Sequence, residues 1–151
     1  MQTDPKLPRG YRNNNPLNIR KSANAWKGKI NPSQDSAFEQ FVSMQYGYRA
    51  ALALMRTYIK KYGCDTIAKI ISRWAPANEN NTLDYIRSVV NIINERLGGN
   101  VTPDTTVTRD NDTLLCDMAY AMSIVENGDK EYTRALGLPD MYTIKSGWRL
   151  L

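Results

Sequence analysis

Beyond Ser43 the apolar residues recur three and four positions apart, which is the spacing of an amphipathic helix. This spacing predicts four helices, and each is followed by residues that commonly end helices, such as Gly, Pro or Asn-Gly. Their apolar stripes fall within residues 48–62, 67–74, 86–97 and 112–126. A shorter helix is predicted to begin at Pro139, because proline suits the first turn of a helix. The chain is therefore expected to be mainly helical.

The N-terminal part has a different pattern, with brief apolar runs separated by turn-forming residues. The runs lie at 18–20, 26–30 and 38–42, and they predict a small antiparallel sheet of two or three strands. The fold class is accordingly α+β, mainly helical. At 151 residues the chain fits a single domain, 1–151. The polar start, 1–12, is expected to be a flexible segment.

The composition narrows the available chemistry, because the chain contains no histidine. A Ser-His or Cys-His nucleophile, an imidazole base and the commonest zinc ligand are therefore excluded. Acid–base chemistry falls to carboxylates, with Tyr or Lys as weaker candidates. Cys64 and Cys116 lie in or beside apolar segments and are expected to be free thiols. No metal site and no cofactor is predicted.

The formal net charge of +5 suits an anionic partner, such as nucleic acid, a membrane surface or the carboxylate-bearing bacterial cell wall. The basic residues are scattered, which is typical of an ordinary solvated surface. Neither a signal-peptide pattern nor a stretch long enough to span a membrane is present. The sequence thus predicts a protein made in the bacterial cytoplasm. A virion, a holin or a secretion system would have to deliver it to the cell wall or periplasm.

Glu126 is the first candidate for acid chemistry. It shares one helical face with Leu115, Ala119 and Met122, so its carboxyl group belongs to an apolar surface. It also lies in the last turn before Gly128, where the helix dipole disfavours another negative charge. Both effects raise the pKa of a carboxyl group, as a general acid near neutral pH requires. The alternative is a frayed helix end whose glutamate extends into water.

Four blocks of the sequence resemble phage-associated lysozyme-like proteins, a family often labelled virion structural proteins. The blocks, in chain order, are RGYRNNNPLNIR at 9–20, WKG with FEQF and GYRA between 26 and 50, RWAP with EN and YI between 73 and 86, and the ENG ending of 121–128. A more distant similarity is to cell-wall glucosaminidases, through residues 15–20, 26–28 and 38–43. In those enzymes the catalytic helix precedes this run, whereas here the ENG motif follows it. The resemblance implies a lysozyme-like, circularly permuted fold.

The resemblance also implies a second carboxylate and a set of sugar-binding residues. Asp35 matches the family motif and is the first choice to face Glu126 across a cleft, with Glu39 as the second choice; the alternative for Asp35 is a turn residue. The candidates for substrate binding are Asn15, Asn18, Trp26, Tyr46, Glu79 and Tyr85. The asparagines could instead order a turn, Glu79 could cap a helix, and aromatic residues on helical stripes are often core. We expect Trp74 to be a core residue and Trp26, in a polar hairpin, to contact the ligand.

Three functions remain open at this point. The first is a glycosidase, either a muramidase or a lytic transglycosylase, that cleaves peptidoglycan glycan strands with a carboxylate general acid. The second is an inactive wall-binding module associated with virion or secretion-system proteins. The third is a basic nucleic-acid-binding protein, but no groove-reading motif supports it and no nucleic acid is expected as a partner.

Overall fold

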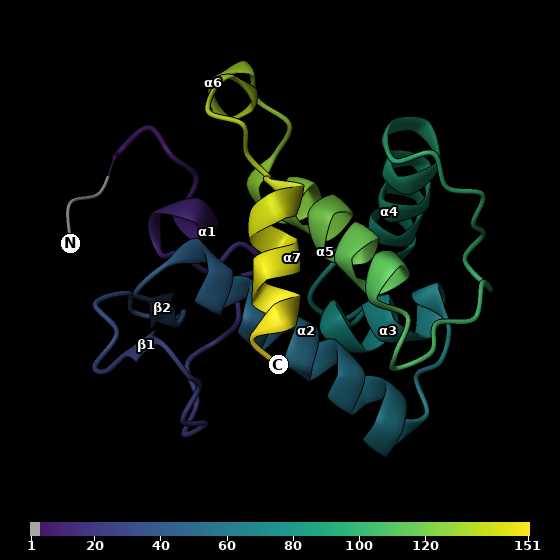
Figure 1. The fold of residues 1–151 in the computed structure, drawn as a ribbon, viewed down its shortest axis with the longest axis horizontal. Helices are drawn as coiled ribbons and strands as arrows, with labels where there is room; N and C mark the ends of the chain where they lie inside the picture. Colours follow the sequence, from purple (N-terminus) through teal and green to yellow (C-terminus); the bar gives the residue numbers. More distant parts are fainter. Residues whose placement is uncertain (1–3) are drawn as a thin grey trace.

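Helices dominate the chain from residue 44 onward, as the apolar spacing predicts. The computed structural model describes residues 4–151 (Figure 1). Its elements in chain order are α1 (Arg9–Arg12), β1 (Lys29–Ile30), β2 (Gln40–Phe41), α2 (Met44–Tyr62), α3 (Ile67–Trp74), α4 (Thr82–Arg96), α5 (Asp112–Asn127), α6 (Glu131–Ala135) and α7 (Met141–Arg149). The α+β, mainly helical class with a small N-terminal antiparallel sheet is confirmed.

Helix α5 runs through the middle of the helical part and is the most apolar of the helices. It contacts α1, α2, α4 and α7, and Figure 1 shows it passing behind α7. Leu115, Met118, Ala119 and Met122 expose none of their surface. A helix that is apolar around most of its circumference belongs in the interior. The packing therefore fixes the position of its C-terminal end, where Glu126 lies.

Polar side chains cap the N-terminal ends of four helices. Thr66, Asn81, Asn111 and Asp140 precede α3, α4, α5 and α7, and each accepts a hydrogen bond from a backbone N–H of the first turn. Gly63 ends α2 in the left-handed conformation, with φ of 66°. The expected start of the last helix at Pro139 is wrong, because Asp140 caps it and Met141 begins it. The short helix α6 is missed by the sequence analysis, since its five residues carry no apolar stripe.

The sheet consists of β1 and β2, paired antiparallel with Lys29 opposite Phe41 and Ile30 opposite Gln40. An isolated bridge between Arg20 and Phe38 adds the third expected segment. The prediction of two or three antiparallel strands is thus confirmed.

The N-terminal segment differs from the expectation that 1–12 is flexible. Residues 1–3 lie outside the described part of the chain. Residues 9–12 form α1, which packs against α5, and the Tyr11 side chain is 2% exposed. For these four residues the expectation is wrong, because a tyrosine in a polar sequence is anchored by tertiary contacts that local composition does not reveal.

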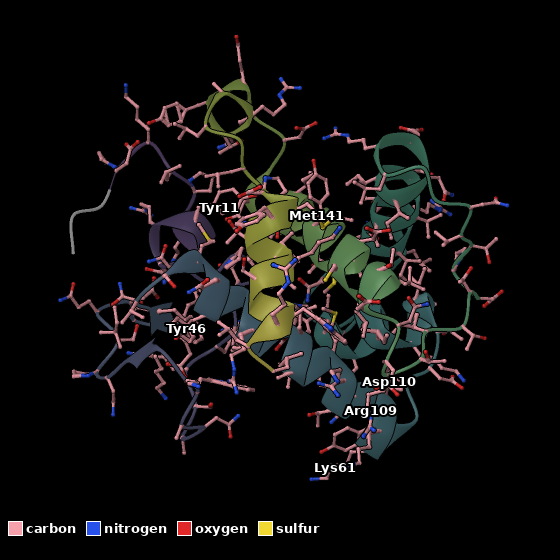
Figure 2. All side chains as sticks on the ribbon, in the orientation of Figure 1. Tyr11, Tyr46, Lys61, Arg109, Asp110 and Met141 are labelled. Carbon is pink, nitrogen blue, oxygen red and sulfur yellow. The ribbon has the colours of Figure 1, made fainter. Side chains whose placement is uncertain are left out.

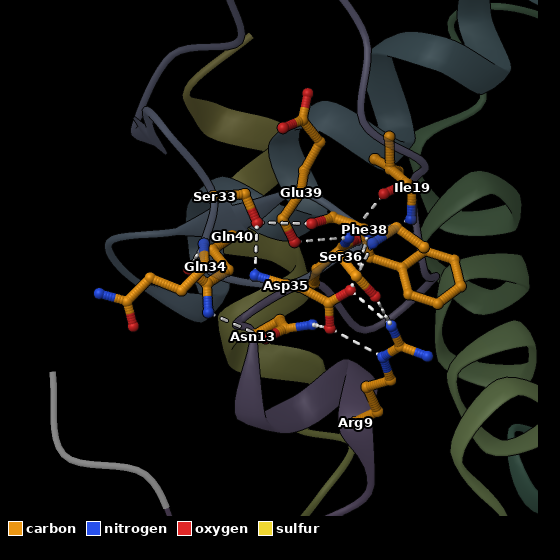
Figure 3. A network of polar contacts seen from close by, with 12 residues as sticks. Arg9, Asn13, Ile19, Ser33, Gln34, Asp35, Ser36, Phe38, Glu39 and Gln40 are labelled. Carbon is orange, nitrogen blue, oxygen red and sulfur yellow. Dashed lines mark hydrogen bonds and ion pairs between the residues drawn. The ribbon is translucent and has the colours of Figure 1, made fainter.

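The Asp35 carboxylate links α1 to the loop before β2 through several hydrogen bonds (Figure 3). Its carboxylate accepts hydrogen bonds from Arg9 Nε at 2.7 Å, Arg9 Nη2 at 2.6 Å and Asn13 Nδ2 at 2.9 Å. The backbone N–H groups of Ala37 and Phe38 donate at 2.9 and 3.0 Å. The Arg9 guanidinium is the main reason why the pKa of Asp35 lies well below its usual value. This carboxylate is a structural anion.

Glu39 is a second internal anion, and its side chain is 1% exposed. Lys29 Nζ lies 3.0 Å from Glu39 Oε2, and the Ser22 N–H donates to the same oxygen at 3.3 Å. Lys29 also donates to the backbone carbonyls of Ser22 and Asn24. The pair therefore holds the loop around residue 22 against the sheet. Figure 3 shows the Glu39 side chain directed away from Asp35.

We predict that Asp35→Asn lowers the free energy of unfolding at pH 7 by about 2 kcal/mol, because charge-assisted hydrogen bonds are weakened. The folded-state pKa of Asp35 is depressed, so its contribution is present above the ordinary value of 3.8 and is lost as the pH falls below it. Urea denaturation from pH 7 down to acid should therefore show the wild type and variant converging. The exposed Asp104→Asn is the matched control, and equal pH dependence for both variants would contradict the assignment.

Candidate functional site

A cleft of about 510 Å³ opens where the N-terminal loops meet the helical part. One wall comes from residues 17–26 with Phe38, and the other from α2 and the segment 73–80. Glu126, in the last turn of α5, also lines the cleft. Among the described residues that line the cleft, only Glu79 and Glu126 carry carboxyl groups.

The Glu126 carboxyl group is held by two hydrogen bonds. Asn18 Nδ2 donates to Oε1 at 3.0 Å, and the Tyr85 hydroxyl donates to Oε2 at 2.8 Å. Burial raises the pKa of Glu126, and the two donors offset part of this effect because they stabilise the ionised form. The sequence-based placement of Glu126 on the apolar face, near the end of its helix, is confirmed. The resulting group can exchange a proton at a fixed position.

The end of α5 is tied to the N-terminal turn by the next residue, Asn127. Its Nδ2 donates to the carbonyls of Pro16 at 2.8 Å and Ser123 at 2.9 Å. Because Asn18 lies two residues beyond Pro16, this link brings Asn18 to the Glu126 carboxyl group. Asn18 itself adopts a positive φ of 54°, a conformation that asparagine tolerates better than most residues.

Asn15 does not reach the cleft, so its predicted role in substrate binding is wrong. Its side chain is fully buried, and its Oδ1 accepts a hydrogen bond from the Ile19 N–H at 2.9 Å. Its Nδ2 donates to the carbonyls of Ile19 and Glu39. The alternative from the sequence, a residue that orders the turn, is correct.

The other two predicted catalytic carboxylates do not line the cleft. Asp35 and Glu39 are not among its lining residues, and both are engaged in the ion pairs described above. The prediction that Asp35 faces Glu126 across the cleft is therefore wrong. Asp35 serves instead as the turn residue that the sequence left open, since the N–H groups of Ala37 and Phe38 donate to it, and it also binds the distant Arg9 and Asn13.

The structure places two tryptophans at the cleft, whereas the sequence analysis expects only Trp26 there. Trp26 and Trp74 both line the cleft, and both are half-buried and packed against the core. Trp74 also contacts the Tyr58 ring edge-on, with ring centroids 6.0 Å apart. The packing of Trp74 against the core agrees with its assignment from the sequence, but Trp74 also lines the cleft, and periodicity does not distinguish a core residue from a cleft wall. The sequence feature that could have indicated a position of Trp74 at the cleft is the RWAP block to which it belongs.

Tyr46 and Tyr85 do not line the cleft, so neither ring is placed to stack on a sugar bound there. Tyr46 packs over Gly28, whose positive φ and lack of a side chain permit this approach. Figure 2 shows Tyr46 on the side of the molecule that carries the sheet, and it does not line the cleft. Tyr85 is 7% exposed, so only its hydroxyl group takes part. Burial, and then the neighbouring Glu126, place the Tyr85 pKa well above its usual value, which keeps the hydroxyl protonated as a donor.

Glu79 lies on the exposed segment that follows α3 and lines the cleft, as Asn18 does. The capping role considered from the sequence belongs to Asn81, whose side chain accepts a hydrogen bond from the Asp84 N–H. Within residues 4–151, no group of three or more Cys, Asp or Glu side chains is arranged to hold a metal ion. None of the helices there is long and apolar enough to cross a bilayer.

We predict that Tyr85→Phe raises the pKa of Glu126 further, because the ionised carboxylate loses one donor while the ring remains in place. Titration of the Glu126 side-chain carboxyl by ¹³C NMR measures this directly. Tyr142→Phe, at a tyrosine that is 73% exposed, is the matched control and should leave the titration unchanged. A lower or unaltered Glu126 pKa in Tyr85→Phe would show that the hydroxyl does not stabilise the carboxylate.

No family model matches the chain. It is 38% identical, over 131 residues, to Protein P5 of Pseudoalteromonas phage PM2, and the aligned region spans 83% of this chain and 74% of the phage protein. The expected association with phages is thereby confirmed. By this identity and coverage, the chain belongs to the family of Protein P5 of Pseudoalteromonas phage PM2.

Proposed function

We propose that the protein is a lysozyme-like, peptidoglycan-cleaving glycosidase of the lytic transglycosylase type. The observation that carries the proposal is the Glu126 carboxyl group, which is half-buried at the wall of an open cleft, is held there by two donors and has a raised pKa. Such a group can stay protonated closer to neutral pH than an ordinary glutamate, as a general acid must.

The proposed reaction uses Glu126 twice. As the acid, it gives its proton to the glycosidic oxygen while the bond from that oxygen to the anomeric carbon breaks. As the resulting carboxylate, it takes the proton of the 6-hydroxyl group of the same sugar, whose oxygen attacks the anomeric carbon. The products are a shortened strand and a 1,6-anhydro sugar end, and no water is consumed. Asn18 and Tyr85 stabilise the ionised form between the two steps, because both donate to the carboxylate.

Transglycosylation fits this cleft better than hydrolysis does. Hydrolysing glycosidases commonly need a second carboxylate to attack the sugar or to activate water. Asp35 and Glu39 are committed to ion pairs elsewhere, and Glu79 is an exposed residue. The muramidase alternative would therefore depend on Glu79 alone.

A glycan strand also suits the walls of the cleft. Trp26 and Trp74 offer apolar ring surface, while Asn18 and Asn24 offer amide groups that can bind N-acetyl and hydroxyl groups. The excess positive charge of the chain favours a wall polymer that carries carboxylates. An inactive module would keep these binding features without depending on Glu126, and the family relationship to a phage protein is compatible with either.

We predict that Glu126→Gln lowers the rate of peptidoglycan cleavage by at least about a hundredfold, because the acid is removed while its shape is kept. The thermal midpoint should not fall, since a neutral amide replaces a desolvated carboxyl group. Turbidity loss of purified cell walls gives the rate, and Glu95→Gln, at an exposed position on α4, is the matched control. Near wild-type cleavage by Glu126→Gln would remove Glu126 from the mechanism. If the wild type cleaves no wall preparation, the inactive module is the correct function.

We also predict that the fragments released by the wild type are lighter by one water than hydrolysis products, as 1,6-anhydro ends require. Mass spectrometry of the soluble fragments separates the two outcomes. Glu79→Gln should retain most of the activity and the same products. Reducing ends together with loss of activity in Glu79→Gln would instead establish hydrolysis with Glu79 as the second carboxylate.

A further inference from the structure

A second hollow, of about 680 Å³, adjoins the cleft on the side of α3. Tyr58, Arg73 and Pro76 line both spaces, so the two are continuous across these residues. The remaining lining residues of the second hollow are Cys64, Ala68, Lys69 and Ser72. None of the described residues lining it is acidic, whereas two are cationic. The hollow is therefore suited to an anion.

Two tyrosine rings pack against the guanidinium group of Arg73. Its guanidinium carbon lies 3.5 Å from the centroid of the Tyr62 ring and 5.1 Å from that of Tyr58. Stacking of this kind restrains the guanidinium but leaves the N–H donors around its edge free. Across residues 4–151, no ion pair or side-chain hydrogen bond involves this guanidinium, in contrast to Arg9, which Asp35 neutralises. The edge of Arg73 is thus available to a carboxylate.

Lys69 adds a second positive charge to the same hollow. It precedes Arg73 by four residues on α3, so the two side chains share one face of the helix. Lys69 Nζ lies 3.2 Å from Asp65 Oδ1, but both side chains are more than half exposed. Exposed pairs of this kind contribute little, so Lys69 can exchange Asp65 for another anion.

We propose that this hollow binds a carboxylate of the peptide attached to a peptidoglycan strand whose sugars lie in the adjoining cleft. The proposal rests on the proposed function for the position of the glycan. The peptide branches from the sugar, so a substituent of a strand in the cleft can pass over Tyr58 and Pro76 to Arg73. The planar guanidinium matches a carboxylate through two parallel hydrogen bonds. The protein therefore prefers peptide-bearing strands to bare glycan. A nucleic acid fits less well, because two cations beside tyrosine rings do not form a track for a phosphate backbone.

The experiment measures binding without turnover, by calorimetry in the Glu126→Gln background. The ligands are soluble peptide-bearing peptidoglycan fragments and the same glycans after an amidase has removed the peptides. Arg73→Gln should weaken binding of the peptide-bearing fragment about tenfold, which is the loss of one charge-assisted contact, and weaken binding of bare glycan much less, because Arg73 also lines the cleft. Lys69→Gln should act in the same direction, and Arg73→Lys should lie between Arg73→Gln and the parent. Arg87→Gln, on the exposed side of α4, is the matched control.

Several outcomes would overturn the carboxylate site. An equal loss for both ligands would make Arg73 a wall of the cleft, and no loss in either Arg73→Gln or Lys69→Gln would remove the site. A larger effect on binding of duplex DNA than on the wall fragment would assign the hollow to nucleic acid. The thermal midpoints of all variants show whether they fold. If loss of the Arg73 stacking unfolds the protein, Lys69→Gln still tests the site.

The location of the peptide can be tested separately through Cys64, a free thiol that lines the hollow. Peptide-bearing fragments should slow alkylation of Cys64 by iodoacetamide, and bare glycan should not. Cys116 is 2% exposed, and burial raises its pKa to about 11, so it should react slowly in all samples. Equal protection by both ligands would contradict the site. Failure of the catalytic proposal is distinguishable, because a wild type that cleaves nothing can still show peptide-dependent binding and protection.

Discussion

The burial of α5 is the constraint on which the rest of the structure depends. Four other helices pack against it, and its interior residues leave no surface to water. A helix held in this way cannot rotate to bring an unfavourable side chain into solvent. Its last turn consequently presents Glu126 at the boundary between the core and the cleft. The desolvation that raises the Glu126 pKa follows from that packing.

Asp35, Glu39 and Glu126 have different roles because their surroundings differ. Asp35 is surrounded by donors, chiefly Arg9, which favour the ionised form and lower its pKa. Glu39 is buried against Lys29, so its charge is compensated within the fold. Glu126 has no cation paired with it among the described ion pairs, and only two neutral donors touch its carboxyl group. Burial therefore raises the pKa of Glu126, whereas Arg9 lowers that of Asp35.

The sequence predicts those features that depend on local spacing. The helical stripes, the glycine at the end of α2 and the position of Glu126 on an apolar face all follow from residues a few positions apart. The ion pair of Asp35 could not be predicted, because its partner, Arg9, is 26 residues away and meets it only in the folded chain. The same reason applies to Tyr11, whose burial depends on contact with the distant helix α5. Trp74 illustrates a further limit, since a helical stripe also supplies residues to cleft walls.

The hydrogen bond between Asn18 and Glu126 joins residues 108 positions apart, and the Asn127 side chain bridges a similar interval to Pro16. Contacts of such long range form only after most of the polypeptide is available to fold. During synthesis, the N-terminal turn emerges long before the helix that completes it. A nascent or truncated chain that ends ahead of α5 has the amide donor but lacks the acid. The site is consequently absent from every translation product that stops before Glu126.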